Sequence, residues 1–356
     1  MKSPTILAKY PPRLAGFTLI EIMVAVAVLV ILILFVAQLT NSATAITRVG
    51  TKHMDADTQA RTVLDRLGFD IGRMIRRNDL DYYIKGAAAY TGHGNGHGWG
   101  KKLTGGQQGS DQCAFFASVP GYYPQSSGQS PISLVAYRIN QNATNSAAPY
   151  LQLERMGKGL LWSGVVTGNP NPNTIYPILF LPNTISSIGT WSAAVSNDNG
   201  TGSGAIDADY EVLGPQVFRF EYLYLLKSGI LTDVPWDQAA TPAHTSLNGW
   251  TDVQAIGVAI AVIDPGARAL IPSTTLLDIA SDLDDFKTAP GRGIGGQKKA
   301  GDIEYRWNTV LFGDPANLAN TPGILNRGTT TAGSVVPREV VKSIRVYVRY
   351  YDLREQ

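Results

Sequence analysis

Apolar and polar positions divide the chain into an N-terminal helical part and a longer part built from short strands. From Phe17 to Ala37, 21 consecutive residues include only two polar ones, Thr18 and Glu21. At about 1.5 Å rise per residue, such a helix spans roughly 30 Å, which is the thickness of the bilayer hydrocarbon. The pattern therefore predicts a membrane-spanning helix at residues 17–37.

An amphipathic pattern follows the apolar span. Oppositely charged side chains stand four residues apart at Arg66 and Asp70, and apolar residues recur at intervals of three and four. The recurring apolar positions are Ala60, Val63, Leu64, Leu67, Ile71, Met74 and Ile75. We expect the helix to continue over residues 38–85, with a bend near Gly50 and an end near residues 77–85.

The remaining residues, 86–356, alternate between β-rich runs and turn-rich loops. Runs rich in aromatic and β-branched residues predict strands at Cys113–Val119, Ser133–Ile139, Tyr150–Arg155, Gln216–Leu226, Gln254–Ile263 and Lys342–Tyr351. A short acidic helix is expected at Ser273–Phe286. A helix followed by strands, without βαβ alternation, indicates an α+β fold in which the long helix packs on an antiparallel sheet.

Charge is concentrated at the N-terminus. The whole chain has a formal net charge of +2 and contains no basic tract, which disfavours nucleic acid as a partner. Lys2, Lys9 and Arg13 stand in the first 16 residues, which contain no acid. Basic residues ahead of an apolar span place the N-terminus in the cytoplasm and send the rest across the membrane. The single cysteine, Cys113, rules out an intramolecular disulfide.

Two ordinary explanations of the apolar span remain open at this point. A cleaved signal peptide would use the small residues Ala43-Thr44-Ala45 as its cleavage site, although its apolar core usually has only about 7–15 residues. An uncleaved signal anchor explains the length but not the acid at Glu21. An ionisable residue inside a membrane span indicates a function by default.

The residues around this acid resemble a known processing signal. Arg13-Leu14-Ala15-Gly16-Phe17-Thr18-Leu19-Ile20-Glu21 closely resembles the type IV prepilin cleavage and methylation motif. The resemblance implies that a prepilin peptidase cuts between Gly16 and Phe17, removes the leader 1–16 and methylates the new amine of Phe17. It also implies that Glu21 pairs with the Phe17 ammonium of a neighbouring subunit during assembly.

Further stretches resemble the J-type minor pseudopilins of type II secretion and, more closely, the prepilin-type cassette protein C family of verrucomicrobial genomes. The stretches that carry this resemblance are Pro120–Tyr123, Ser133–Arg138, Leu153–Leu160 and Glu211–Phe220. It implies a single-pass protein of the bacterial inner membrane with a periplasmic head. The implied partners are prepilin peptidase, other pilins or pseudopilins, an inner-membrane assembly platform and membrane lipid.

Candidate chemical sites outside the N-terminus are weak. Calcium ligands are conceivable at Asp278, Asp282, Asp284 and Asp285, and also at Asp198, Asp207 and Asp209. His93 and His97 stand on a glycine loop that does not align them as metal ligands. Gly291–Gly296 has the letters of a dinucleotide-binding motif without the flanking strand and helix. No catalytic motif occurs, so we expect neither an enzyme nor a cofactor.

Two functions fit these observations. The first is a structural minor pilin or pseudopilin subunit that assembles through its N-terminal helix into a type II secretion or pilus-like fibre. The second is a membrane-anchored periplasmic binding protein or enzyme that uses a prepilin-like anchor. Substitution of Glu21 separates the two, because a simple anchor tolerates the loss of that acid.

Overall fold

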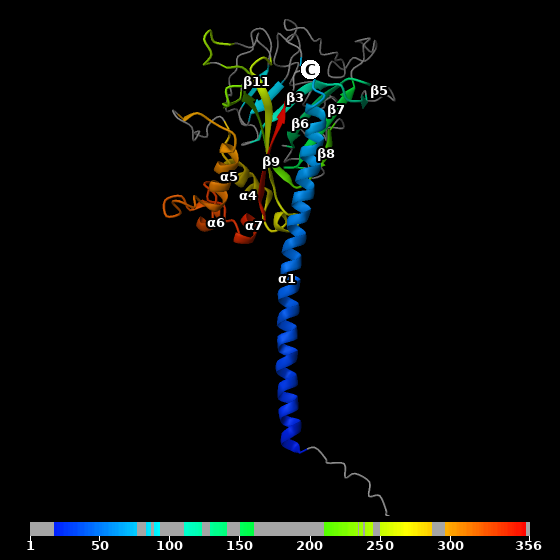
Figure 1. Cartoon of the computed structure of the whole chain (residues 1–356), viewed down its shortest axis with the longest axis vertical. Helices are drawn as coiled ribbons and strands as arrows, with labels where there is room; N and C mark the ends of the chain where they lie inside the picture. Colours follow the sequence, from blue (N-terminus) through cyan, green and yellow to red (C-terminus); the bar gives the residue numbers. More distant parts are fainter. Residues whose placement is uncertain are drawn as a thin grey trace, which may run out of the picture. The chain divides into compact units, whose positions relative to one another are not determined.

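The computed structural model describes residues 18–76, 83–86, 89–92, 110–122, 129–140, 150–159, 210–233, 235–237, 239–244, 250–286 and 296–353. The chain divides into two compact units, Met1–Lys52 and His53–Gln356, and each is described by itself. Helix α1 (Leu19–Ile71) contributes to both units, and Figure 1 shows the order of the elements along the chain. The arrangement of a long helix followed by antiparallel sheets confirms the predicted α+β class.

In the first unit, the predicted apolar span is helical. Every side chain from Leu19 to Thr44 is exposed. The hydroxyl groups of Thr40 and Thr44 donate to the backbone carbonyls four residues earlier, each at 2.8 Å. These bonds satisfy both hydroxyls within the helix, as an apolar environment requires. The helix is unbroken at Gly50, where the sequence predicted a bend.

The head contains two sheets where the sequence suggested one. Sheet A runs in the order β2-β1-β3-β6-β7-β4-β5, with β8 also paired to β7, and sheet B runs β10-β9-β11-β12. The strands of sheet A are β1 (Tyr83–Gly86), β2 (Ala89–Gly92), β3 (Gln112–Ala117), β4 (Gly121–Tyr122), β5 (Gln129–Ser130), β6 (Ser133–Ile139), β7 (Leu153–Gly159) and β8 (Tyr210–Gly214). Those of sheet B are β9 (Val217–Leu226), β10 (Leu231–Thr232), β11 (Val253–Val262) and β12 (Arg345–Asp352). The named strand pairs are antiparallel apart from β4 with β7.

Five short helices accompany the sheets in the described part of the head. They are α3 (Pro265–Arg268), α4 (Ser273–Asp282), α5 (Asp302–Phe312), α6 (Gly323–Arg327) and α7 (Arg338–Ser343). The acidic helix predicted at Ser273–Phe286 corresponds to α4. The sequence analysis did not predict α5, although its buried residues Ile303, Trp307 and Leu311 have the spacing of one helix face.

Most predicted strands are confirmed, and two are displaced. The strand predicted at Tyr150–Arg155 begins only at Leu153, because Leu151 adopts a positive φ of 54° in the turn that precedes β7. The strand predicted at Lys342–Tyr351 begins at Arg345, because helix α7 occupies its first residues. In both cases a local turn or helix, rather than the apolar pattern, fixes where the strand starts.

Helix α1 ends earlier than the predicted residues 77–85. Its last residue is Ile71, and the chain then pairs with sheet A in an extended form. The amide of Ile75 donates to Phe116 O at 2.8 Å, and Met74 forms an isolated bridge with Ala117. The helical spacing continues into Met74 and Ile75, but pairing with β3 buries these residues without another helical turn. Residues 83–86 form strand β1 and not the end of the helix.

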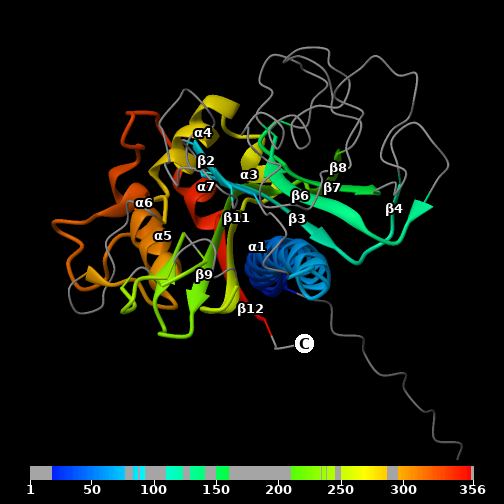
Figure 2. The same ribbon diagram turned by 90° about the horizontal axis from the view of Figure 1, so that it is seen from above.

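The head part of α1 packs against both sheets. Its buried stripe consists of Ala56, Ala60, Val63, Leu64, Leu67 and Ile71, each at most 7% exposed, which confirms the predicted amphipathic helix. On sheet B, side chains at alternate positions of β12 contact the helix: Tyr347 donates to Asp57, Arg349 pairs with Asp65, and the Tyr351 hydroxyl donates to the carbonyl of Leu64. Figure 2 shows sheet B with α1 on one side and α5 on the other.

A buried ion pair joins α1 to sheet A. Asp70 is 0% exposed and accepts two hydrogen bonds from the Arg155 guanidinium on β7, at 2.7 and 3.2 Å. The Tyr137 hydroxyl on β6 donates to the same carboxylate at 2.5 Å. Arg66, the partner that the sequence predicted for Asp70, lies at 3.6 Å, and Glu211 contacts Arg155 at 3.3 Å. The predicted pair therefore belongs to a larger network.

The head should fold without the membrane span, because His53–Gln356 is a compact unit with its own core. We expect a truncation that starts near residue 45 to be soluble and cooperatively folded without detergent. Thermal unfolding followed by circular dichroism, with size-exclusion chromatography, checks this. Aggregation of the truncated protein under mild conditions would contradict it and would show that the head needs other subunits.

Candidate functional site

The predicted assembly residue, Glu21, lies at the start of α1, and the predicted processing residues precede it in the sequence. Gly16 and Phe17, the predicted cleavage pair, lie outside the described residues, which begin at Thr18. Glu21 lies in the first turn of α1, where acidic side chains favour the partial positive charge of a helix N-terminus. Its position there follows from the sequence, since Thr18 and Glu21 have the spacing of a capping box.

The structure forms this capping box. The backbone amide and the hydroxyl of Thr18 both donate to Glu21 Oε2, at 2.8 and 2.9 Å. In return, the amide of Glu21 donates to the Thr18 hydroxyl at 3.3 Å. Both donors use Oε2, and within the described part of the chain no donor contacts Oε1. Glu21 is therefore fixed in position while one carboxylate oxygen stays available to a donor from outside.

The helix that follows is long and apolar enough to cross a membrane. Residues Leu19–Thr44 form a 26-residue stretch with a mean hydropathy of 3.3 and no buried residues. Length and composition alone do not separate a membrane anchor from a signal sequence. The distinction rests on the motif that immediately precedes the helix.

The four aspartates predicted as calcium ligands do not form one set. Asp278 accepts from the Ser334 hydroxyl, and Asp282 accepts from the Thr331 amide at 2.7 Å. These two residues fasten α4 to the loop that precedes α7. Burial raises the pKa of Asp284, and the nearby Arg306 and Arg219 oppose this rise only in part. Only Asp285 lies in a group of three potential ligands within the described residues.

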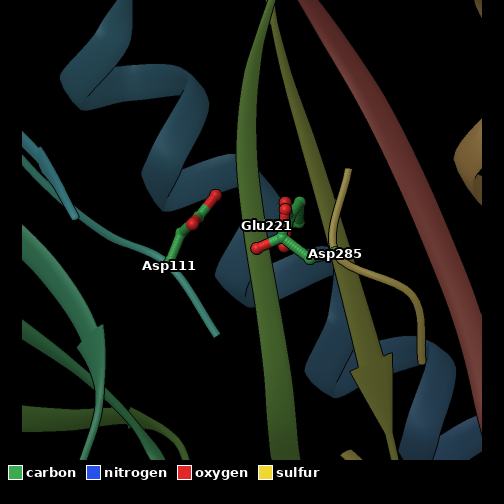
Figure 3. A group of neighbouring side chains, drawn as sticks. All are labelled: Asp111, Glu221 and Asp285. Carbon is green, nitrogen blue, oxygen red and sulfur yellow. The ribbon is translucent and has the colours of Figure 1, made fainter. Parts of the chain in front are cut away.

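That group brings together Asp111, Glu221 and Asp285, whose carboxylate oxygens lie within 4.8 Å of one another (Figure 3). Asp111 precedes β3, Glu221 lies on β9, and Asp285 follows α4. The first two are almost completely buried. Oxygen ligands of this kind suit a hard divalent cation. The sequence analysis missed Asp111 and Glu221, because only the pairing of distant strands brings them near Asp285.

Hydrogen bonds and an ion pair within the protein already engage several oxygens of this carboxylate group. The Tyr222 amide donates to Asp111 Oδ2 at 3.0 Å, and the Phe286 amide donates to Glu221 Oε1 at 2.9 Å. Arg219, itself 0% exposed, lies 2.9 Å from Glu221 Oε2. These bonds fasten the segments before β3 and after α4 onto β9. The arrangement supports a buried polar junction between the two sheets.

The other candidate sites mostly lie outside the described residues. These are His93, His97, Asp198, Asp207, Asp209 and Gly291–Gly295. Gly296 is described and has a φ of +79°, in the region that favours glycine. Cys113 is buried on β3, and its burial raises the pKa of the thiol well above the ordinary value. A buried, protonated thiol is a core side chain and not a nucleophile.

Comparison with known proteins bears on the N-terminal element alone. The model of the prokaryotic N-terminal methylation motif matches residues 13–37, which include Gly16, Phe17 and Glu21. No curated protein and no solved structure matches the chain significantly. The matched residues contain the capping box and most of the apolar stretch Leu19–Thr44. The chain thus carries a prepilin-type methylation motif at the start of a long apolar helix.

Proposed function

We propose that this chain is a minor pilin or pseudopilin, a structural subunit that prepilin peptidase processes and that assembles into a fibre through its N-terminal helix. One observation carries the proposal: the methylation motif leads directly into an exposed 26-residue apolar helix whose first turn positions Glu21. The described head adds a folded domain to this helix. No sequence motif for catalysis accompanies it, which favours a structural role.

The finer assignment extends this proposal to the J-type position of a type II secretion system, or to its equivalent in a related fibre. The stretches that resemble J-type pseudopilins cover β7, most of β6 and β8, and the start of β9. Among the described strands, β6, β7 and β9 each pair on both sides, whereas β8 pairs with β7 alone. The basic leader favours an inner-membrane protein with a cytoplasmic N-terminus and a periplasmic head. Partner pseudopilins and an inner-membrane assembly platform complete this proposal.

The capping box suggests how Glu21 takes part in assembly. Cleavage after Gly16 turns Phe17 into an N-terminal ammonium next to Thr18. When helices pack in parallel, the ammonium of one subunit meets Glu21 of its neighbour, and each charge is then compensated in a medium of low dielectric constant. Thr18 holds Oε2 of that carboxylate, so Oε1 accepts from the neighbour without dissolving the helix cap.

Processing tests the proposal directly. We expect the mature protein to begin with N-methylated Phe17, to lack residues 1–16 and to keep the apolar helix. Intact mass spectrometry and N-terminal sequencing of membrane-extracted protein measure this.

Gly16→Leu should block cleavage, because a side chain at the scissile position prevents close backbone approach to the peptidase. Ala15→Ser is the matched control and should leave cleavage unchanged. A mature N-terminus after Ala45 would contradict the proposal and favour an ordinary secreted protein.

A further inference from the structure

A cleft on the head, beside α5, is lined by aromatic, aliphatic and polar side chains. Its volume is about 500 Å³, within the range of roughly 300–1,000 Å³ that small-molecule sites occupy. The lining residues used below are Glu304, Tyr305, Asn308, Thr309, Phe312 and Leu318. We propose that this cleft binds a saccharide that carries an amino group. The proposal goes beyond assembly and does not depend on it.

One face of α5 forms the floor of the cleft. Glu304, Tyr305, Asn308, Thr309 and Phe312 recur at the spacing of a single helix face, while the opposite face is buried against the head. Tyr305 and Phe312 are two turns apart, or about 10 Å along the helix axis. Each ring can therefore contact a different sugar unit, and the amide and hydroxyl between them can bond to sugar hydroxyls.

The wall of the cleft opposite α5 is formed by the loop that follows this helix, and its conformation is fixed by internal contacts. After α5, the amides of Ala316 and Asn317 donate to the side chain and the backbone carbonyl of Asp314, at 2.9 and 3.0 Å. Gly313 has a φ of +91°, and a Cβ there would lie 2.6 Å from a methyl carbon of Leu318. These contacts fix the loop against α5. A preformed wall lowers the ordering cost of binding any ligand that fits the cleft.

The chemistry of the lining selects among ligand classes. Loop amides near the cleft bond within the protein: Gly313 donates to Thr309 O at 2.8 Å, and Asp314 donates to Thr321 O at 3.0 Å. The loop therefore offers no strand edge to an extended peptide. Glu304 is the only charged residue of the lining, which disfavours phosphates and favours an ammonium group. A single carboxylate is also too few for a metal site.

Binding by the full-length processed protein tests this, in a detergent without a sugar headgroup. Isothermal titration calorimetry would compare three probes: the trisaccharide of glucosamine, its N-acetylated form and cellotriose. We expect the glucosamine trimer to bind most tightly, with a Kd below about 1 mM. Tyr305→Ala and Asn308→Ala should each weaken it about tenfold. Glu304→Gln should bring the aminated and acetylated probes to similar affinities.

Val335→Ser is the matched control, because Val335 is an exposed apolar residue, 74% accessible, that does not line the cleft. This variant should bind like the wild type. Circular dichroism confirms that each variant is folded. The proposal is overturned if no probe binds at about 10 mM, or if Tyr305→Ala and Asn308→Ala leave binding unchanged.

Discussion

Replacing Arg155 with methionine should lower the free energy of unfolding of the head by about 3–5 kcal/mol, because it leaves the buried Asp70 carboxylate without its main partner. Asp70 is 0% exposed, so water cannot replace the two hydrogen bonds that Arg155 donates. Burial lowers the pKa of Arg155, but the hydrogen bonds and charge of Asp70 outweigh that effect and raise it. Urea unfolding followed by tryptophan fluorescence measures the loss.

A surface pair in the same head provides the control. Arg349 and Asp65 form an ion pair whose side chains are 47% and 67% exposed, and Arg349→Met should cost only about 0–1 kcal/mol. The double variant Asp70→Leu with Arg155→Met should be more stable than the sum of the single effects predicts, since it leaves no charge unpaired. Equal losses for Arg155→Met and Arg349→Met would show that the buried pair does not hold α1 to sheet A.

Tyr137, the third member of this network, makes the stability of the head depend on pH. Burial, followed by the charge of Asp70, raises the pKa of Tyr137 well above its ordinary value. Because the folded-state pKa is the higher one, the stabilisation by the protonated hydroxyl is complete below pH about 10 and is lost as the pH rises towards the folded-state value. Tyr137→Phe should cost about 1–3 kcal/mol at neutral pH, since it removes one donor to a buried carboxylate.

Glu21→Ala should abolish most incorporation beside partner subunits and leave membrane insertion and the folding of the head unchanged. The loss of one partner from a poorly solvated ion pair costs about 3–5 kcal/mol, which corresponds to at least a hundredfold weaker association. Glu21→Gln should be equally defective if charge matters, and mild if a hydrogen bond is enough. Co-purification of tagged partners, after equal expression and processing are confirmed, measures the effect.

Thr18→Val separates capping from pairing. This variant removes the hydroxyl bonds of the capping box but keeps the bond from the Thr18 amide to Glu21, so its assembly defect should be milder than that of Glu21→Ala. Assembly of both Glu21 variants at the wild-type level would contradict pairing between subunits. That result would favour the alternative of a membrane-anchored binding protein or enzyme.

The sequence by itself determined the N-terminal element, because its signals are local. The span from Leu19 is set by unbroken hydrophobicity, and the capping box by the three-residue separation of Thr18 and Glu21. The buried stripe of α1 follows from helical periodicity, and β6 matches its predicted bounds because its residues favour a buried strand. In each case, neighbours within a few residues supply the deciding interactions.

Only the tertiary structure decided where α1 ends, how the strands divide into two sheets and which charges meet. Asp70 accepts its main hydrogen bonds from Arg155, 85 residues away in the sequence, although Arg66 is only four residues away. Asp285 forms a carboxylate group with Asp111 and Glu221 and not with the aspartates near it in the sequence. Helical spacing specifies which face of an element is buried but not what covers it. Long-range strand pairing supplies that information, and buried charges then bond with whichever groups the pairing brings within reach.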